Sequence, residues 1–112
     1  MRRICVLGID IAKQVFQLHG VDEKGVAVMR KRLTHGKLSE FIAPCLIGLE
    51  ACGGAHYWAR EFDRFGHQVK LISPQFVKPF VKSNKNDAAD AEAICIAVSQ
   101  PHMRFVPVKA ID

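Results

Sequence analysis

The sequence predicts one α/β domain in which helices flank a mixed five-stranded sheet. Three observations favour this fold class. Two apolar runs, at 4–9 and 45–49, contain no charge, which is typical of strands buried on both faces of a sheet. Each run is followed directly by an acid, Asp10 or Glu50. A third segment, from about Asp87 to Ser99, has the N-cap residues and the apolar spacing of a helix.

The first third of the chain predicts an antiparallel meander. Residues 4–9 form its first strand, and residues 15–21 roughly alternate between apolar and polar side chains. An Asp-Glu-Lys-Gly turn follows, and residues 26–33 resume the strand pattern. The cations at 30–32 are typical of a solvated edge strand, where they discourage pairing with other sheets.

The rest of the chain alternates helices and strands. The predicted elements are a short helix at 34–43, a strand at 45–49, a helix at about 55–65 that Gly66 ends, a strand at 68–72 and a broken helix or ordered loop at 75–82. The final helix at 87–99 follows them. Three antiparallel strands and then two parallel ones, with helices between them, is the order of ribonuclease H-like folds.

Length and charge bound the organisation and the partner. A chain of 112 residues with 49% hydrophobic content has room for one compact core, which we assign to residues 1–100. Residues 101–112 contain two prolines and predict a tail or the start of a connection. The formal net charge is +5, and five cations but no acid lie between Asp63 and Asp87. This distribution favours a polyanionic partner.

The cysteines and the apolar runs predict a cytoplasmic protein. None of the four cysteines has the spacing of a zinc site, so we interpret them as buried thiols in a reducing compartment. The basic N-terminus resembles the start of a signal peptide, but its apolar run is interrupted by Gly8 and Asp10. No run approaches the roughly 20 apolar residues that span a bilayer.

Four acids form the candidate site. Asp87 and Asp90 lie one turn apart on the face of the last helix that continues into its apolar stripe. First-turn acids also favour the helix dipole, which is the simpler interpretation. If the strands at 4–9 and 45–49 are parallel neighbours, however, Asp10 and Glu50 leave the sheet at the same edge. The four carboxylates then predict a Mg²⁺ or Mn²⁺ site for phosphodiester chemistry, because hard cations prefer oxygen ligands.

Four ordered motifs resemble the DEDD transposases of the IS-one-ten family of insertion sequences. They are GIDIAK at 8–13, LEACGG at 49–54, PQFVKPF at 74–80 and KNDAADA at 85–91, and RFVPVK at 104–109 is similar as well. The resemblance covers nearly the whole chain. Cys52 differs from the threonine of many members, and Ala55 and His56 replace a common tyrosine region.

The resemblance implies a RuvC-like N-terminal domain in which Asp10, Glu50, Asp87 and Asp90 are the catalytic and metal-binding tetrad. It further implies DNA as substrate, a structured guide RNA, and a homo-oligomer of the full-length protein. Family members continue into a C-terminal domain with a proposed serine nucleophile. We therefore expect these 112 residues to retain the fold and the metal site, without strand transfer unaided.

Four lysines are candidate nucleic-acid contacts because they flank the expected mouth of the site: Lys13, Lys78, Lys82 and Lys85. Solvated loop lysines are the alternative interpretation.

Three other functions share parts of this sequence pattern. An actin-like or sugar-kinase ATP-binding domain also begins with Gly-Ile-Asp, but Ala12 occupies the position of its phosphate-loop glycine. A non-catalytic nucleic-acid-binding module and a Holliday-junction-type nuclease fit the same pattern.

Overall fold

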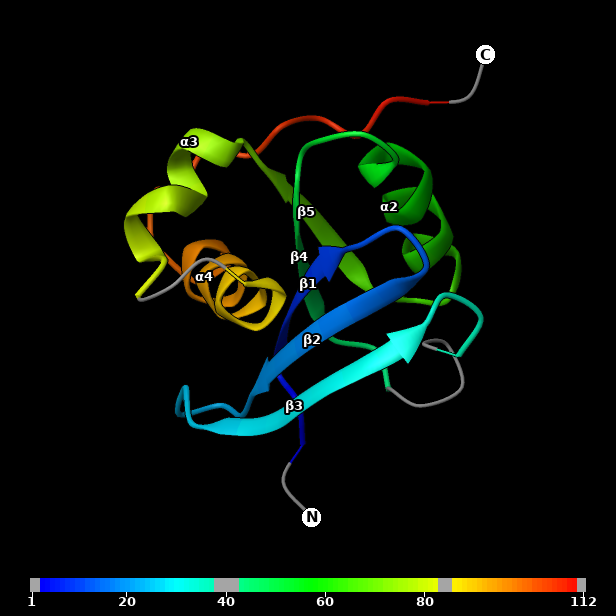
Figure 1. Ribbon diagram of the computed structural model, residues 1–112. Coiled ribbons are helices and arrows are strands. Elements are labelled where there is room, and N and C mark those ends of the chain that lie inside the picture. Colours follow the sequence, from blue (N-terminus) through cyan, green and yellow to red (C-terminus); the bar gives the residue numbers. More distant parts are fainter. Residues whose placement is uncertain (1–2, 38–42, 83–85, 111–112) are drawn as a thin grey trace.

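A computed structural model describes residues 3–37, 43–82 and 86–110 of the chain (Figure 1). Five strands form one sheet in the order β3-β2-β1-β4-β5. The elements in chain order are β1 (Val6–Ile11), β2 (Val15–Val21), β3 (Ala27–Thr34), β4 (Leu46–Glu50), α2 (Ala55–Arg64), β5 (Gln68–Ile72), α3 (Pro74–Val77), the 3₁₀ turn η1 (Lys78–Phe80) and α4 (Asp87–Val98). This mixed sheet with flanking helices confirms the predicted α/β class and its ribonuclease H-like arrangement.

The sheet changes direction at its centre. β1 pairs antiparallel with β2, and β2 pairs antiparallel with β3. On its other side β1 pairs parallel with β4, which pairs parallel with β5. Each parallel connection carries the chain back across the sheet, so the carboxyl ends of β1, β4 and β5 lie at one edge.

Side chains alternate between the two faces of this sheet. Leu7 and Ile9 of β1 and Phe16 of β2 join one core cluster, which α2 covers through Ala59 and Phe62. The alternate positions face α4, and Ile94 and Val98 of that helix belong to a second cluster. Figure 1 shows α2 and α4 on opposite sides of the sheet, so the molecule has three layers.

Two glycines let α4 lie close to the central strands. A Cβ on Gly8 of β1 would overlap the Ala91 carbonyl oxygen and lie 2.5 Å from the Cys95 backbone nitrogen. A Cβ on Gly48 of β4 would lie 2.8 Å from the Cβ of Val98. Because these strands have no side chains there, the helix backbone packs directly on the sheet.

The element boundaries follow the predictions with a few differences. β1 begins later than predicted and continues through Asp10 to Ile11, because β2 extends the ladder by pairing Asp10 with Gln17 and Ile11 with Phe16. The broken helix at 75–82 is confirmed by α3 and η1. The sequence predicts a helix at 34–43, but Thr34 is the last residue of strand β3. Residues 38–42 of the predicted helix lie outside the described residues.

The segment after α4 returns to the sheet. The Val106 amide donates a 2.8 Å hydrogen bond to the Leu71 carbonyl at the free edge of β5. Arg60 of α2 donates to the Lys109 carbonyl at 2.6 Å, and the Lys109 amide donates to Nδ1 of His56 at 3.0 Å. No helix in the described part of the chain is long and apolar enough to cross a membrane.

Replacing Gly8 by alanine tests the close approach of α4. The added Cβ would collide with backbone atoms of Ala91 and Cys95, which cannot rotate away. We expect Gly8→Ala to lower the free energy of unfolding by about 1–3 kcal/mol, as other overpacked cores do. Gly36→Ala is the control, since no described atom lies within 4 Å of its Cβ position. Equal stability of the two variants in urea denaturation would contradict this packing.

Candidate metal centre

Two of the four predicted acids come from adjacent parallel strands. Ile9 of β1 pairs with Leu49 of β4, so the next residues, Asp10 and Glu50, are neighbours at the same edge. Both follow the alternation that directs Gly8 and Gly48 toward α4, and both therefore lie on the α4 face. The predicted meeting of these two strand ends agrees with the register.

The other two acids come from the first turn of α4. Asn86 caps this helix through its side-chain oxygen, which accepts a 2.8 Å hydrogen bond from the Ala89 amide. The cap fixes where the helix begins, and hence places Asp87 and Asp90 in the first turn. Because α4 lies on β1 at Gly8, its N-terminal end reaches the carboxyl end of that strand.

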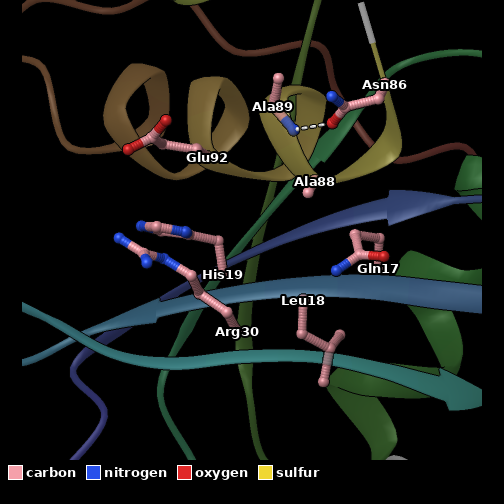
Figure 2. A pocket seen from close by; sticks show the side chains of 8 residues that line it. All are labelled: Gln17, Leu18, His19, Arg30, Asn86, Ala88, Ala89 and Glu92. Atoms are coloured by element: carbon pink, nitrogen blue, oxygen red, sulfur yellow. Dashed lines mark hydrogen bonds between the residues drawn. The ribbon is translucent and has the colours of Figure 1, made fainter.

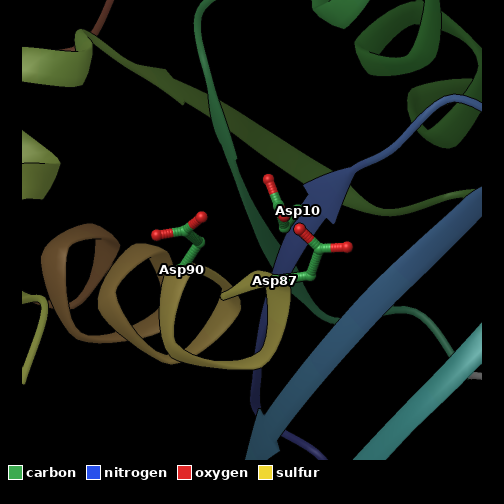
Figure 3. Close-up of side chains that lie close together, drawn as sticks. All are labelled: Asp10, Asp87 and Asp90. Atoms are coloured by element: carbon green, nitrogen blue, oxygen red, sulfur yellow. The ribbon is translucent and has the colours of Figure 1, made fainter. Parts of the chain in front are cut away.

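Asp10, Asp87 and Asp90 form a compact carboxylate group, which we call the acid triad. One carboxylate oxygen from each residue lies within 4.8 Å of the others, and all three residues are partly buried. Figure 3 shows Asp87 and Asp90 projecting from α4 toward the end of β1, where Asp10 lies. Glu50 falls outside this group of described residues, although it remains close enough to interact with Asp10 and Asp90.

The acid triad is electrostatically unfavourable without a cation. Burial raises the pKa of Asp10 to about 7, and the negative charges of Asp87 and Asp90 add to the increase. Burial and the charge of Asp90 also raise the pKa of Glu50, while the ammonium of Lys78 lowers it. A proton or a cation at Asp10 would relieve this repulsion.

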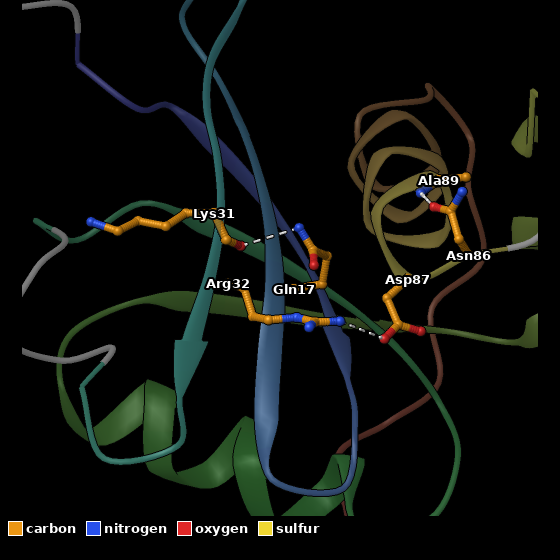
Figure 4. Close-up of polar contacts among 6 residues, drawn as sticks. All are labelled: Gln17, Lys31, Arg32, Asn86, Asp87 and Ala89. Carbon is orange, nitrogen blue, oxygen red and sulfur yellow. Dashed lines mark hydrogen bonds and ion pairs between the residues drawn. The ribbon is translucent and has the colours of Figure 1, made fainter.

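One arginine partly compensates this charge. Nη2 of Arg32 on β3 lies 3.7 Å from a carboxylate oxygen of Asp87 (Figure 4). The two side chains are 63% and 43% exposed, so solvent weakens the attraction. Asp10 and Asp90 make no ion pair within the described ranges.

The donor chemistry of the acid triad fits a hard divalent cation. Three oxygen ligands from carboxylates suit Mg²⁺ or Mn²⁺, which bind one or a few carboxylates and keep several waters.

The four cysteines are all free, and Cys52 is the exposed one. Burial of its thiol is the main cause that raises the pKa of Cys52, and the nearby charges of Glu50 and Asp10 raise it further. Only Cys95 is fully buried, so the prediction of four buried thiols is wrong.

The four predicted lysine contacts have different surroundings. Lys78 acts on the charge of Glu50, whereas Lys82 lies 3.6 Å from Glu92 on α4. Lys13 is exposed in the turn after β1, and Lys85 lies outside the described residues.

Sequence reasoning assigned no role in the site to Arg32. The signal was present in the alternation of β3: Arg32 pairs with Gln17, which pairs with Asp10, so the three share one row across the sheet. Finding it required the strand register, which the sequence did not supply.

The fold is thus a ribonuclease H-like arrangement with clustered carboxylates at the ends of its central strands. The chain is similar in sequence to transposases. It is 56% identical over 109 residues to the "Probable family 20 transposase" of Pseudomonas aeruginosa. The matched region covers 95% of this chain and 32% of the relative. No protein-family model matches the chain.

Two further relatives are named for insertion sequence elements. The chain is 50% identical over 115 residues to the transposase for IS1328 of Yersinia enterocolitica, and 48% identical over 115 residues to the transposase for IS1111A of Coxiella burnetii. These matches cover 100% of this chain, and 34% and 32% of the relatives. The chain therefore spans about a third of the length of the relatives it matches, and the predicted resemblance to insertion sequence transposases is confirmed.

The raised pKa of Asp10 predicts how the metal-free chain responds to pH. Its folded pKa of about 7 exceeds the ordinary aspartate value of 3.8, so the folded state binds more protons than the unfolded state between these limits. Stability in EDTA should fall as the pH rises from about 4 to 7. Asp10→Asn should then stabilise the chain at pH 8 by about 1–2 kcal/mol, after allowance for solvent screening.

Urea denaturation of wild type and Asp10→Asn at pH 5 and pH 8 measures this effect. Glu23→Gln, in the exposed turn after β2, is the control and should leave the pH dependence unchanged. An Asp10→Asn chain less stable than wild type at pH 8 would show that Asp10 is favourably paired instead.

Proposed function

We propose that this chain is the RuvC-like, metal-binding part of a DEDD transposase of the IS-one-ten family. In this proposal Asp10, Glu50, Asp87 and Asp90 hold Mg²⁺ or Mn²⁺ and act on DNA phosphodiesters to mobilise an insertion sequence. The single observation that carries it is the convergence of Asp10, Asp87 and Asp90 to within 4.8 Å. The names of the relatives, which are transposases, support the same reaction.

In this proposal the acids bind the metal and the lysines bind the phosphate backbone. Asp10, Asp87 and Asp90 would hold the cation, and Glu50 on the adjacent strand would complete the ligand set. When bound, divalent cations supply activation of a water and stabilisation of the leaving oxygen. Lys78, whose charge acts on Glu50, would position a phosphate beside the acids, and Lys13, Lys82 and Lys85 would extend the contact with the backbone.

The guide RNA and the homo-oligomer are proposed for a longer protein than this chain. The relatives are about three times as long, so strand transfer, a guide RNA and a homo-oligomer belong to the proposal for the longer protein. The acid site is the part of that activity that these residues would supply. A plain nucleic-acid binder is the competing function, and it predicts no response to metal.

Calorimetric titration with Mn²⁺ at pH 7.5 tests the proposal. We expect wild type to bind Mn²⁺ and to gain thermal stability, by about 2.7 kcal/mol at 100 times the Kd. Asp10→Asn and Asp87→Asn should lose at least tenfold in affinity, because each removes a charged ligand. The control Asp63→Asn lies at the far end of α2 and should bind as wild type does.

Retention of full Mn²⁺ affinity in Asp10→Asn would contradict the proposed metal site. The absence of any Mn²⁺ response in wild type would favour the plain binder.

A further inference from the structure

A polar cleft lies beside the acid triad, between α4 and strands β2 and β3. α4 packs over β1 and β4 and also contacts β2, whereas the same face of β3 is left beside it. The cleft has a volume of about 230 Å³ and lies between these strands and the first turns of α4 (Figure 2). We call it the β2–α4 cleft; its polar lining residues are Gln17, His19, Arg30, Asn86 and Glu92.

The strand register connects this cleft to the candidate metal centre. Gln17 pairs with Asp10, and two residues further along β2, His19 pairs with Gly8. On β3, Arg32 and Arg30 pair with the same two residues of β2. Two residues along a strand span roughly 6.6 Å and neighbouring strands lie about 4.8 Å apart, so a group bound between His19 and Arg30 would lie roughly 10 Å from Asp10 at the level of the backbone, which one or two nucleotides can span.

Arg30 brings a positive charge to the cleft, and Glu92 brings a negative one. Glu92 lies 3.6 Å from Lys82, and Asp87 lies 3.7 Å from Arg32. Of the carboxylates that the structure describes, none is within ion-pair distance of Arg30. Its guanidinium is therefore available to an anion that enters the cleft.

His19 is a second hydrogen-bonding side chain in the cleft. Its side chain is only 6% exposed, and it lines the cleft beside Arg30 (Figure 2). Within 3–37, 43–82 and 86–110, no side chain or carbonyl forms a hydrogen bond with its ring. Burial lowers its pKa, so the neutral ring offers one N–H donor at pH 7. The ring nitrogens of His19 are not among the buried, unpartnered side-chain atoms of the described residues, so they are open to the cleft and to a ligand that enters it.

We propose that the β2–α4 cleft binds a backbone phosphate of the DNA strand whose neighbouring phosphodiester lies at the acid triad. Arg30 and His19 donate to the phosphate oxygens, and the N-terminal end of α4 adds its favourable dipole. This inference rests on the proposed function and identifies the path of its substrate. Protection of an edge strand accounts for a cation on β3, but it does not account for the placement of Arg30 and His19 in one cleft.

DNA binding by the full chain tests the assignment. We would measure the anisotropy of a labelled single-stranded oligodeoxynucleotide, in EDTA and in Mn²⁺, for wild type, Arg30→Gln and Lys31→Gln. Lys31 is the matched control, because it neighbours Arg30 but pairs with Leu18 on the α2 face, and Figure 4 shows its side chain directed away from α4.

Arg30→Gln should weaken DNA binding about tenfold in both buffers, as expected for loss of a charge-assisted contact. It should also reduce the slope of log K against log salt by about 0.7, the value for one phosphate of a single strand. Lys31→Gln should change both quantities much less.

Equal effects of the two substitutions, or no DNA binding by wild type, would overturn the assignment of the cleft. An Arg30 effect confined to an RNA strand of the same sequence would overturn it as well. Failure of the metal proposal is separate: Mn²⁺ would then leave DNA affinity unchanged in wild type, while the difference between the Arg30 and Lys31 variants would persist in EDTA.

Discussion

The direct packing of α4 on β1 at Gly8 is the constraint on which the candidate site depends. A side chain at this position would force the helix away from the sheet, and Gly48 keeps the same space free on β4. Because the backbones touch, the first turn of α4 reaches the end of β1, and two acids from one helix meet a third from a strand 77 positions earlier. The same close packing places the first turns of α4 against β2 and leaves β3 beside the helix, and the β2–α4 cleft lies between them.

This packing places the carboxylates of Asp10, Asp87 and Asp90 close enough to repel one another. The large increase in the pKa of Asp10, to about 7, comes from burial first and from the neighbouring acids next. Arg32 offers only a long, exposed contact to Asp87. A protein normally avoids such an arrangement, and strained electrostatics of this kind concentrates at functional sites. A divalent cation would convert the repulsion into ligand binding.

Local patterns in the sequence predicted much of the fold. The alternation at Val15–Val21, the apolar strand at Gln68–Ile72 and the capped helix at Asp87 each specify their own structure, and chain topology then places β1 next to β4. What the sequence could not supply depends on register and on helix placement. Glu50 lies apart from the tight acid triad, and Arg30 and Arg32 join the site face through pairing across β2. From the charge pattern along the chain alone, we interpret Arg30 and Arg32 as cations of an edge strand.

The central claim is that α4 and β1 together bind a divalent cation between Asp10, Asp87 and Asp90. A crystal structure of the chain grown with Mn²⁺, with anomalous diffraction recorded at the manganese edge, tests it most directly. The account predicts an anomalous peak about 2.1–2.2 Å from carboxylate oxygens of all three residues, with α4 still packed on Gly8. Manganese bound elsewhere, or the three carboxylates separated with the site empty at saturating Mn²⁺, would contradict it.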